Sequence, residues 1–482
     1  MLMGTVFIIQ PHSIKYVNVA IKITMNNQFN QFSLTHALLD NLDELKFHSM
    51  TPIQAQSLGY ILENKDVIGQ AKTGSGKTAA FGLGILNSLD TSTPKITGLI
   101  LCPTRELAEQ VAKEIRTLAR KMKNVKILTI CGGVQEIHQE KSLQHGAHII
   151  VGTPGRVLRL LRKNLLDFSY VKTFVLDEAD RMLDMGFYDD IRNIEEHLPL
   201  KKQTLLFSAT YPPEIGQLSQ GIQKDAIEVK VDTEHEENII AQYFYEVARH
   251  QDKKEALLKV LGHYKPDRLI VFCKTKQITD DVAKFLNRHE IFAAAIHGDL
   301  GQNERTTVLT KFTNRSLSVL VATDVAARGL DIEDLAAVIN FDLPADPEIY
   351  IHRIGRTGRA GLKGSAFSFF VAKNIYKLES IEDYTQRQYK VEDLNTIELS
   401  KYEQVPPMKT MYVGGGKKNK LRPGDLLGAI VGVGKVDSSD VGNISVFNIL
   451  SYVAIKSDKI EQVITNLQSG TIKNKKFKVG LA

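Results

Sequence analysis

Short apolar, β-branched runs alternate with helical stretches along most of the chain. The first set of runs covers residues 97–102, 125–131, 148–151, 173–176 and 204–207. After an acidic segment, a second set covers residues 268–273, 291–296, 318–322, 337–341 and 366–371. Strands that alternate with helices are typical of parallel sheets with crossover connections. The pattern therefore predicts two α/β domains in tandem.

A different pattern follows Pro406 and Pro407. Strands are expected at residues 410–413, 444–447, 452–455 and 477–481, with helices at residues 423–430 and 458–467. This spacing favours a small α/β fold of about 75 residues. The charged segment that leads to the two prolines is expected to be helical.

These patterns divide the chain into five segments. We expect an N-terminal extension at residues 1–25, α/β domains at 26–231 and 238–385, a linker at 386–407 and a small domain at 408–482. Because Met25 opens a polar stretch, residues 1–24 are interpreted as an extension or as the product of a misplaced start. A native N-terminus at Met1, measured by mass spectrometry, would reject this interpretation.

Composition narrows the class of protein. Of the 482 residues, 43% are hydrophobic and 24% charged, which excludes collagen-like, mucin-like and wholly disordered chains. Cys102, Cys131 and Cys273 are too far apart for a disulfide framework or the paired spacing of a structural zinc site. The apolar run at residues 6–9 is much shorter than the ~20 residues of a membrane span. We therefore expect a cytoplasmic protein with no membrane segment and no signal peptide.

A phosphate-binding loop lies in the first domain. The sequence Ala71-Lys72-Thr73-Gly74-Ser75-Gly76-Lys77-Thr78 follows an apolar segment and precedes a helix-favouring run. Its glycines free backbone N–H groups for phosphate oxygens, Lys77 can reach the β and γ phosphates, and the Thr78 hydroxyl suits Mg²⁺. Ala71 stands where the general pattern has glycine. The expected ATP contacts are Ala71, Thr73, Gly74, Ser75, Gly76, Lys77 and Thr78.

Acidic residues follow the apolar run at residues 173–176. Asp177-Glu178-Ala179-Asp180 stands at the carboxyl end of an expected parallel strand, where such sheets place their ligands. Asp177 can hold hydrated Mg²⁺, and Glu178 can orient and deprotonate the water that attacks the γ-phosphate. Such a tetrad alone is compatible with a solvated turn, but beside a phosphate loop it indicates ATP hydrolysis.

These motifs occur in the order found in the DEAD-box RNA helicases, which the chain resembles over residues 29–372. The resemblance implies two tandem RecA-like parallel-sheet domains plus a small C-terminal RRM-like α/β domain, with ATP and Mg²⁺ as cofactors. It implies that Gln54, within Thr51-Pro52-Ile53-Gln54, bonds the adenine edge and that Phe32 stacks on the base. An amide and an aromatic ring suit these roles. Lys46 and Met50 depart from the family's usual Gly and Pro.

The same resemblance implies RNA-backbone contacts. The matching segments of the first domain are Pro103-Thr104-Arg105-Glu106-Leu107, Gly132-Gly133 and Thr153-Pro154-Gly155-Arg156, with contacts expected from Arg105, Gly133, Thr153 and Arg156. Arginines, hydroxyls and glycines suit phosphate positioning and read no base sequence. Ser208-Ala209-Thr210 resembles the motif that links hydrolysis to unwinding, and its hydroxyls are expected to bond the Asp180 carboxylate.

The second domain is expected to complete the ATP site. Phosphoryl transfer gains from cations that neutralise the transition state, and the first domain supplies no arginine finger. The segment from His352 to Arg359 resembles the family's arginine motif, which implies that Arg356 and Arg359 reach the γ-phosphate and that His352 takes part in coupling. Residues 322–331 resemble a further motif, which implies that Thr323 contacts RNA and Asp331 the ATP ribose. Residues 272–275 and 302–305 resemble further RNA-backbone segments.

The tail, residues 408–482, carries 12 lysines and arginines against 5 acidic residues, or +7, which leaves −1 for the rest of the chain. It resembles the RNA-binding domain of the DbpA-like bacterial DEAD-box proteins, an atypical RNA-recognition-motif fold. Cations beside glycines suit RNA phosphates, and the expected contacts are Lys417, Lys418, Lys420 and Arg422. The usual closely spaced aromatics are degenerate, and Phe447 is expected in the core or at an edge.

This resemblance implies large-subunit (23S) ribosomal RNA and pre-ribosomal particles as partners, with a role in large-subunit assembly and no obligate protein partner. Two lobes that each hold part of the site predict RNA-stimulated ATP hydrolysis by closure, with local RNA unwinding. Three alternatives stay open: an ATP-gated RNA clamp, a DNA helicase, and a binding module without hydrolysis. A strand-displacement assay separates the first, comparison of RNA and DNA as ATPase activators separates the second, and the intact phosphate loop disfavours the third.

Overall fold

The structure is a computed structural model that describes residues 27–71, 74–133, 135–231, 240–327, 335–358, 363–403 and 405–482. The expected N-terminal extension therefore lies outside the described residues. The chain divides into two compact units, residues 1–232 and, for the most part, residues 233–482. Across the described ranges, no helix is long and apolar enough to cross a membrane.

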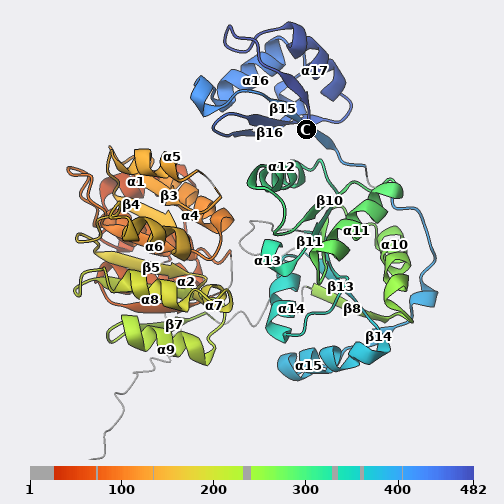
Figure 1. Cartoon of the computed structure of the whole chain (residues 1–482), viewed down its shortest axis with the longest axis horizontal. Coiled ribbons are helices and arrows are strands. Elements are labelled where there is room, and N and C mark those ends of the chain that lie inside the picture. Colours follow the sequence, from red (N-terminus) through yellow and green to blue (C-terminus); the bar gives the residue numbers. More distant parts are fainter. Residues whose placement is uncertain are drawn as a thin grey trace, which may run out of the picture. The chain divides into compact units, whose positions relative to one another are not determined.

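The first unit is built on a seven-stranded parallel sheet (Figure 1). Its strands are β1 (Val67–Gln70), β2 (Gly98–Leu101), β3 (Ile127–Ile130), β4 (Ile149–Gly152), β5 (Thr173–Asp177), β6 (Gln203–Ser208) and β7 (Ile227–Lys230). Their order across the sheet is β3-β4-β2-β5-β6-β1-β7. The first set of five apolar runs corresponds to β2 through β6, so the predicted parallel sheet is confirmed.

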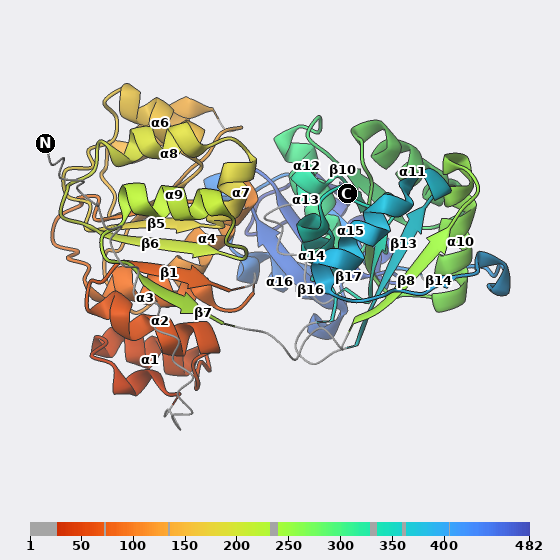
Figure 2. The same cartoon turned by 90° about the horizontal axis from the view of Figure 1, so that it is seen from below.

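Helices cover both faces of this sheet. They are α1 (His36–Glu44), α2 (Pro52–Leu62), α3 (Lys77–Asn87), α4 (Arg105–Leu118), α5 (Glu136–Leu143), α6 (Pro154–Arg162), α7 (Ala179–Asp184), α8 (Tyr188–Glu195) and α9 (Pro213–Ile222). Figure 2 shows α6, α8 and α9 on one side of the sheet and α2 and α3 on the other. In β5, Val175 packs in the core of α1 to α4, while Phe174 and Leu176 pack in the core of α6 to α9. Burial of alternate residues on opposite faces explains the continuous apolar runs.

The second unit contains two sheets, and the larger has seven parallel strands. These are β8 (Ile240–Glu246), β9 (Leu269–Phe272), β10 (Ala293–Ile296), β11 (Val319–Ala322), β12 (Ala337–Asn340), β13 (Gly364–Phe370) and β14 (Val391–Glu392). Their order is β10-β11-β9-β12-β13-β8-β14. The helices of this domain are α10 (Lys253–Tyr264), α11 (Lys276–Arg288), α12 (Gln302–Thr313), α13 (Asp324–Ala327), α14 (Pro347–Ile354) and α15 (Ile375–Thr385). The second set of predicted runs corresponds to β9 through β13.

The segment expected as a helical connection packs against this larger sheet. Helix α15 ends at Thr385, and β14 then pairs with β8. Ile397 and Tyr402 are buried in the core of the domain, and the Tyr402 hydroxyl donates to the carbonyl oxygen of Pro266 at 2.6 Å. The prediction of a helix up to the prolines is therefore wrong after residue 385, because these apolar residues tie an extended segment to the domain.

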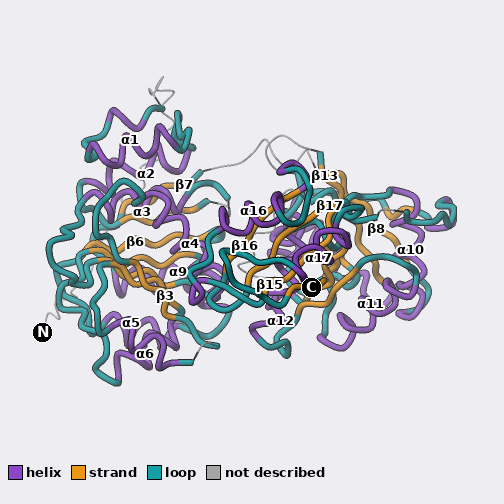
Figure 3. The backbone as a smooth tube through the Cα atoms, turned by 90° about the horizontal axis from the view of Figure 1, so that it is seen from above, coloured by secondary structure: helices purple, strands orange, loops and turns teal. Residues whose placement is uncertain are grey.

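The tail forms a separate antiparallel sheet. Its strands are β15 (Met408–Val413), β16 (Val441–Val446), β17 (Ser451–Lys456) and β18 (Val479–Leu481), in the order β16-β17-β15-β18. Helices α16 (Pro423–Gly432) and α17 (Ile460–Ser469) lie over the strands in Figure 3. Met411, Val413, Val453 and Ile455 pack with these helices in one core. The predicted small α/β fold is confirmed.

Candidate nucleotide and RNA site

Three neighbouring strands of the first unit end at one edge of its sheet. β1 leads into the phosphate loop, β5 ends at Asp177, and β6 lies between them and ends at Ser208. Gln70 is paired with Ser208, and the Ala71 N–H donates to the Ser208 carbonyl oxygen at 3.0 Å. The residues predicted to handle phosphate and metal therefore meet at the carboxyl edge, where parallel sheets place ligands.

The phosphate loop has the backbone shape that its glycines predict. Gly74 and Gly76 adopt left-handed conformations, with φ of +81° and +89°. A Cβ atom at Gly76 would overlap the side chain of Gln54, so both conformation and space require glycine there. The Lys77 ammonium donates to the Ala71 carbonyl oxygen at 2.7 Å, and α3 begins at Lys77. A helix N-terminus behind left-handed glycines fits a polyphosphate.

The other predicted ATP contacts of the loop are Thr78, Ser75 and Thr73. Thr78 is the second residue of α3 and is half-buried, and Ser75 lies between the two left-handed glycines. Thr73 lies outside the described residues, so its predicted contact stays a prediction.

Gln54 links the predicted adenine-reading segment to the phosphate loop. Its Oε1 accepts from the Thr51 N–H at 2.9 Å, and its Nε2 donates to the Gly76 carbonyl oxygen at 3.0 Å. An amide nitrogen carries two hydrogens, so one is left for the adenine contact predicted for Gln54. Phe32 is half-buried and lies against Gly59 of α2. Both predicted adenine contacts therefore stand on or beside α2.

Asp177 has the character of a metal-binding carboxylate. Burial raises its pKa to about 6, against the opposing effect of the Lys77 charge. Its Oδ1 atom is buried and makes no hydrogen bond. A buried carboxylate oxygen without a partner fits a divalent cation or a water of its shell. The residues present therefore fit Mg²⁺, which when bound neutralises charge on transferring phosphates.

Glu178 sits at a tight turn beside Asp177. Its φ of +55° is left-handed, and it is the N-cap residue of α7. Its Oε2 accepts from Nη1 of Arg181 at 3.0 Å, with both side chains buried. Arg181 therefore holds the Glu178 carboxylate in place. Sequence reasoning did not identify Arg181, although its position three residues later on a helix was a usable signal.

Asp180 connects α7 to the end of β6. Its Oδ2 accepts from the Thr210 hydroxyl at 2.9 Å, the Thr210 N–H at 3.0 Å and the Ala209 N–H at 3.2 Å. The Asp180 N–H donates to the Ser208 hydroxyl at 3.4 Å. The predicted contact with the Asp180 carboxylate is therefore present for the Thr210 hydroxyl, whereas the Ser208 hydroxyl meets the Asp180 backbone N–H instead. The turn that carries Glu178 and the segment after β6 form one hydrogen-bonded body.

A buried ion network stands at the strand ends of the second unit. Arg353 donates through Nε and Nη2 to the two carboxylate oxygens of Asp324, at 2.6 and 2.8 Å. Its Nη1 donates to Oδ1 of Asn340 at 3.0 Å and to the Asp342 carbonyl oxygen at 2.7 Å. Lys253 donates to Oδ1 of Asp342 at 2.7 Å. The network joins α10, α13, α14 and the end of β12.

Three predicted residues of the second unit are close in sequence to members of this network. Thr323 follows β11 and precedes Asp324, while His352 and Arg356 flank Arg353 in sequence. Arg356 is buried. Arg359 and Asp331 lie outside the described residues, so their roles stay predictions. Sequence reasoning missed the network itself.

The family of the chain follows from comparison with known proteins. Residues 51–218 match the DEAD/DEAH box helicase family, residues 252–361 the helicase conserved C-terminal domain, and residues 410–481 the DbpA RNA binding domain. The chain is 45% identical to the ATP-dependent RNA helicase DbpA of Escherichia coli strain K12, over 93% of this chain and 98% of the relative. The chain belongs to the DEAD-box RNA helicases.

Other relatives match about three quarters of this DEAD-box helicase. The DEAD-box ATP-dependent RNA helicase CshA of Bacillus cereus is 44% identical over 77% of this chain and 70% of the relative. The structure of Saccharomyces cerevisiae Dbp5 bound to RNA and ADP BeF3 matches with a TM-score of 0.70 at 33% identity, over 77% of this chain and 96% of that chain. The protein is therefore an RNA-stimulated ATPase and ATP-dependent RNA helicase with a DbpA-type RNA-binding domain.

The predicted RNA contacts of the helicase's first domain lie at the same sheet edge as its phosphate loop. They follow β2, β3 and β4, which are adjacent strands. The Arg105 guanidinium lies against Gly132 and Gly133, and a Cβ at Gly133 would overlap it. Thr153 precedes α6 as its N-cap residue, and Arg156 donates to Oε1 of Gln139 at 3.1 Å. The four predicted contacts therefore line a single edge.

The predicted cations of the helicase's tail lie on one exposed loop between β15 and α16: Lys417, Lys418, Lys420 and Arg422. The Lys417 and Lys418 N–H groups donate to the carbonyl oxygens of Phe447 and Asn448, at 2.8 and 2.9 Å. Phe447 follows edge strand β16 and is 38% exposed, so it lies at an edge and outside the core. The loop is thus held by its backbone while its charges face solvent.

Proposed function

We propose that this helicase is directed by its tail to large-subunit (23S) ribosomal RNA, and that it unwinds local duplexes of pre-ribosomal particles in the cytoplasm during large-subunit assembly. The observation that carries the proposal is the exposed basic loop of the tail. The backbone of this loop is held by hydrogen bonds, and within the tail its lysine side chains form no ion pair with an acidic residue. Such lysines are suited to bind the phosphates of a structured RNA. The match of residues 410–481 to the DbpA RNA binding domain supports the same target class.

The core is proposed to grip RNA without reading it. Arg105, Gly133, Thr153, Arg156 and Thr323 stand at strand ends and offer guanidinium, hydroxyl and backbone groups. These groups recognise sugar and phosphate, so they position a strand of any sequence. Target choice then belongs to the tail, and duplex opening to the core.

The ATP site is proposed to work through groups of both domains. Asp177 and Thr78 hold Mg²⁺, Lys77 holds the terminal phosphates, and Glu178 takes the proton of the attacking water. Arg356 and Arg359 stabilise the charge that develops on the γ-phosphate. Asp180, Ser208, Thr210 and His352 couple hydrolysis to RNA, while Gln54, Phe32 and Asp331 bind the nucleoside.

A paired substitution in the basic loop tests the targeting proposal. Lys417→Ala with Lys418→Ala is compared with Lys435→Ala and Lys459→Ala, which remove the same charge elsewhere in the tail. ATPase activity is titrated with a 23S ribosomal RNA fragment and with an unrelated RNA. Two lost phosphate contacts lower the salt slope of fragment binding by about 2. The half-maximal concentration of the fragment should rise in the loop variant only.

Two outcomes would contradict the targeting proposal. One is an equal loss of affinity for the 23S fragment in both variants, which would show that the effect depends only on the net charge of the tail. The other is an equal loss for both RNAs, which would give the loop no part in target choice. A strand-displacement assay on the same samples separates a helicase from an RNA clamp that closes without unwinding.

A further inference from the structure

The outer face of the tail's sheet is buried along the central strands β15 and β17, which is unusual for a small antiparallel sheet. Met411 and Val413 point into the tail's own core, so Thr410 and Tyr452 belong to the opposite face. An antiparallel sheet that packs helices on one face commonly leaves the other face in water. Here Thr410 is 1% exposed, Tyr452 5% and Ala454 1%.

The groups that cover this face belong to α12 and to the turn after it. The Tyr452 hydroxyl hydrogen-bonds the Thr307 hydroxyl at 2.7 Å. The Thr410 hydroxyl hydrogen-bonds the Ser316 hydroxyl at 2.7 Å and accepts from Nδ2 of Asn314 at 3.2 Å. Figure 1 shows the tail's strands between α12 and the tail's own helices. The face is therefore covered by the second helicase domain.

A bulge in edge strand β16 extends the same contact. The pairing of β16 with β17 shifts register between Val441 and Ile444, around Gly442 and Asn443. Glycine in a strand interior often marks such a bulge, which re-aims a neighbouring side chain. Nδ2 of Asn443 donates to Oδ1 of Asn314 at 3.2 Å. Asn314, which is buried, therefore donates to the tail and accepts from it.

Lys311 adds a charged contact on the same helix. Its ammonium donates to the backbone oxygen of Ala482 at 2.7 Å, and burial lowers the pKa of this lysine. Thr307, Lys311 and Asn314 recur at helical spacing, so they form one stripe along α12 and its end. The opposite end of α12 carries Gln302 and Arg305, two residues of the predicted RNA-backbone segment.

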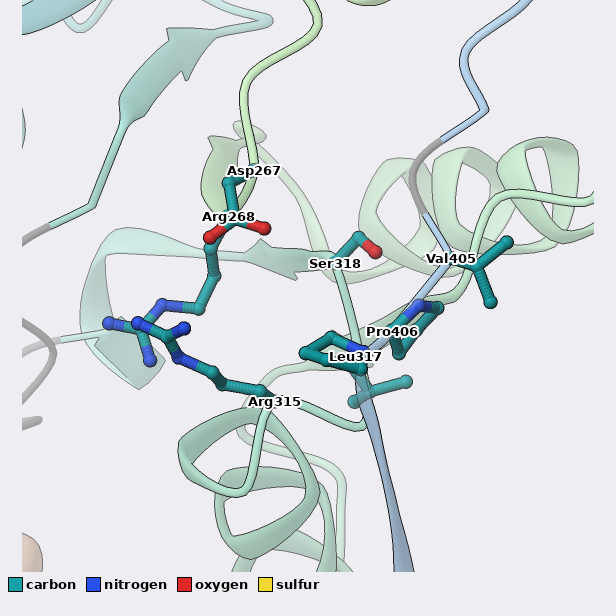
Figure 4. A pocket seen from close by; sticks show the side chains of 8 residues that line it. Asp267, Arg268, Arg315, Leu317, Ser318, Val405 and Pro406 are labelled. Carbon is teal, nitrogen blue, oxygen red and sulfur yellow. The ribbon is translucent and has the colours of Figure 1, made fainter. Parts of the chain in front are cut away.

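The connection to the tail is also anchored. The Ser457 hydroxyl donates to the Pro406 carbonyl oxygen at 2.7 Å, and the Ser457 N–H donates to that of Pro407 at 3.0 Å. Figure 4 shows Pro406 beside Leu317, where both line a small pocket. Two prolines restrict the backbone at this exit. A short, stiff connection keeps the tail at high effective concentration beside α12.

We propose that the outer face of the tail's sheet is a docking surface for α12 of the same chain, and that the docked arrangement is the working one. The contact is made of hydroxyl, amide and ammonium groups, all of which water can also satisfy, so docking is reversible. Docking fixes the basic loop relative to the RNA-contacting end of α12. The core therefore receives RNA from the tail in one orientation rather than anywhere within reach of a flexible tether.

A disulfide tests docking in the full chain. Ser316→Cys with Thr410→Cys replaces two hydroxyls whose oxygens lie 2.7 Å apart, which brings their β-carbons within the range of a disulfide. The control joins Ser316→Cys with Ser439→Cys, an exposed position of the tail outside this face. The native thiols of Cys102, Cys131 and Cys273 are buried, and burial raises the pKa of each, so they do not compete.

Mild oxidation should cross-link the first pair almost completely and the control pair several-fold less, as read from free-thiol counts by mass spectrometry. Equal cross-linking of the two pairs, or none in the first, would overturn docking. Because cysteine at a buried site can disturb folding, Thr307→Arg offers a second route, with Thr313→Arg as the exposed control on α12. Energy transfer is measured between dyes attached at Lys284→Cys and Ser439→Cys. It should fall in the Thr307→Arg chain and stay the same in the Thr313→Arg chain. Unchanged energy transfer in the Thr307→Arg chain would contradict docking.

The working role of the docked state is read from unwinding. The oxidised Ser316→Cys, Thr410→Cys chain should unwind an RNA duplex within about twofold of its reduced form, whereas a loss that reduction restores would overturn the role. This inference rests on the RNA helicase activity and not on the ribosomal target. A chain that cross-links but shows no preference for ribosomal RNA would remove the targeting proposal and leave docking intact.

Discussion

The carboxyl edges of the two helicase sheets both bury charges, but they satisfy those charges differently. In the first unit, Oδ1 of Asp177 is buried without a hydrogen bond, and the pKa of this carboxyl is raised to about 6. In the second unit, Arg353 forms two hydrogen bonds with Asp324, and Lys253 is paired with Asp342. A buried carboxylate oxygen without a hydrogen-bond partner is suited to bind a ligand, whereas buried charges that are paired with one another stabilise the fold.

The comparison is tested most strongly at Glu178. Glu178→Gln keeps the shape of the side chain and removes the proposed proton acceptor, so RNA-stimulated kcat should fall about 10²- to 10⁴-fold. Nucleotide binding, measured by fluorescence titration, should persist. Glu196→Gln makes the same change at an exposed position and should leave kcat unchanged. Near-normal turnover in Glu178→Gln would remove the catalytic assignment of the first edge.

At the carboxyl edge of the second sheet, a substitution in the ion network should lower the stability of the fold. Arg353→Ala leaves the partly exposed Asp324 without its cation and leaves the buried Oδ1 of Asn340 and the Asp342 carbonyl oxygen without this donor, which should lower the free energy of unfolding by about 2–4 kcal/mol. Lys390→Ala, which breaks the exposed ion pair with Glu392, should cost less than about 1 kcal/mol. Denaturant unfolding of the full chain measures both. Equal effects of the two substitutions would contradict a scaffold role for the network.

A smaller change, and an increase in stability instead of a loss, is expected when Asp177 is replaced. Its pKa rises from 3.8 to about 6 on folding, so the carboxyl favours the folded state fully below pH 4 and loses that contribution as the pH rises through 6. Asp177→Asn avoids this loss and should be more stable than the natural chain at pH 8 by up to ~3 kcal/mol. The difference should vanish below pH 4. Unfolding is measured without Mg²⁺, and a destabilised variant at pH 8 would show that the carboxylate is satisfied after all.

Most strands of the two large sheets were predictable because they are largely buried on both faces and therefore read as continuous apolar runs. β7, β8 and β14 were not predicted, since two of them are short or half-exposed and β8 mixes polar residues with aromatic ones. The phosphate loop and the tetrad at Asp177 were predictable because their chemistry is local in sequence.

The rest of the site depends on contacts between distant residues. Arg353 and Asp324 are 29 positions apart, and Lys253 and Asp342 are 89 apart. Periodicity reports which side chains are buried but not which buried charges meet. A usable signal was present, since Asp324 and Asp342 each stand within two residues of the end of an apolar strand. The residues that cover the tail's outer face gave no such signal, because single hydroxyls and amides are common on exposed helices.

The burial of Ile397 and Tyr402 decides where a tail can be exchanged between relatives. A hybrid protein joined at residue 385 would replace both side chains with foreign ones and open a hole in the second helicase domain, whose newly exposed apolar lining promotes aggregation. A junction after Tyr402 keeps that lining covered. To transfer RNA specificity between such enzymes, the junction should therefore lie after the last side chain that is buried in the recipient's second helicase domain.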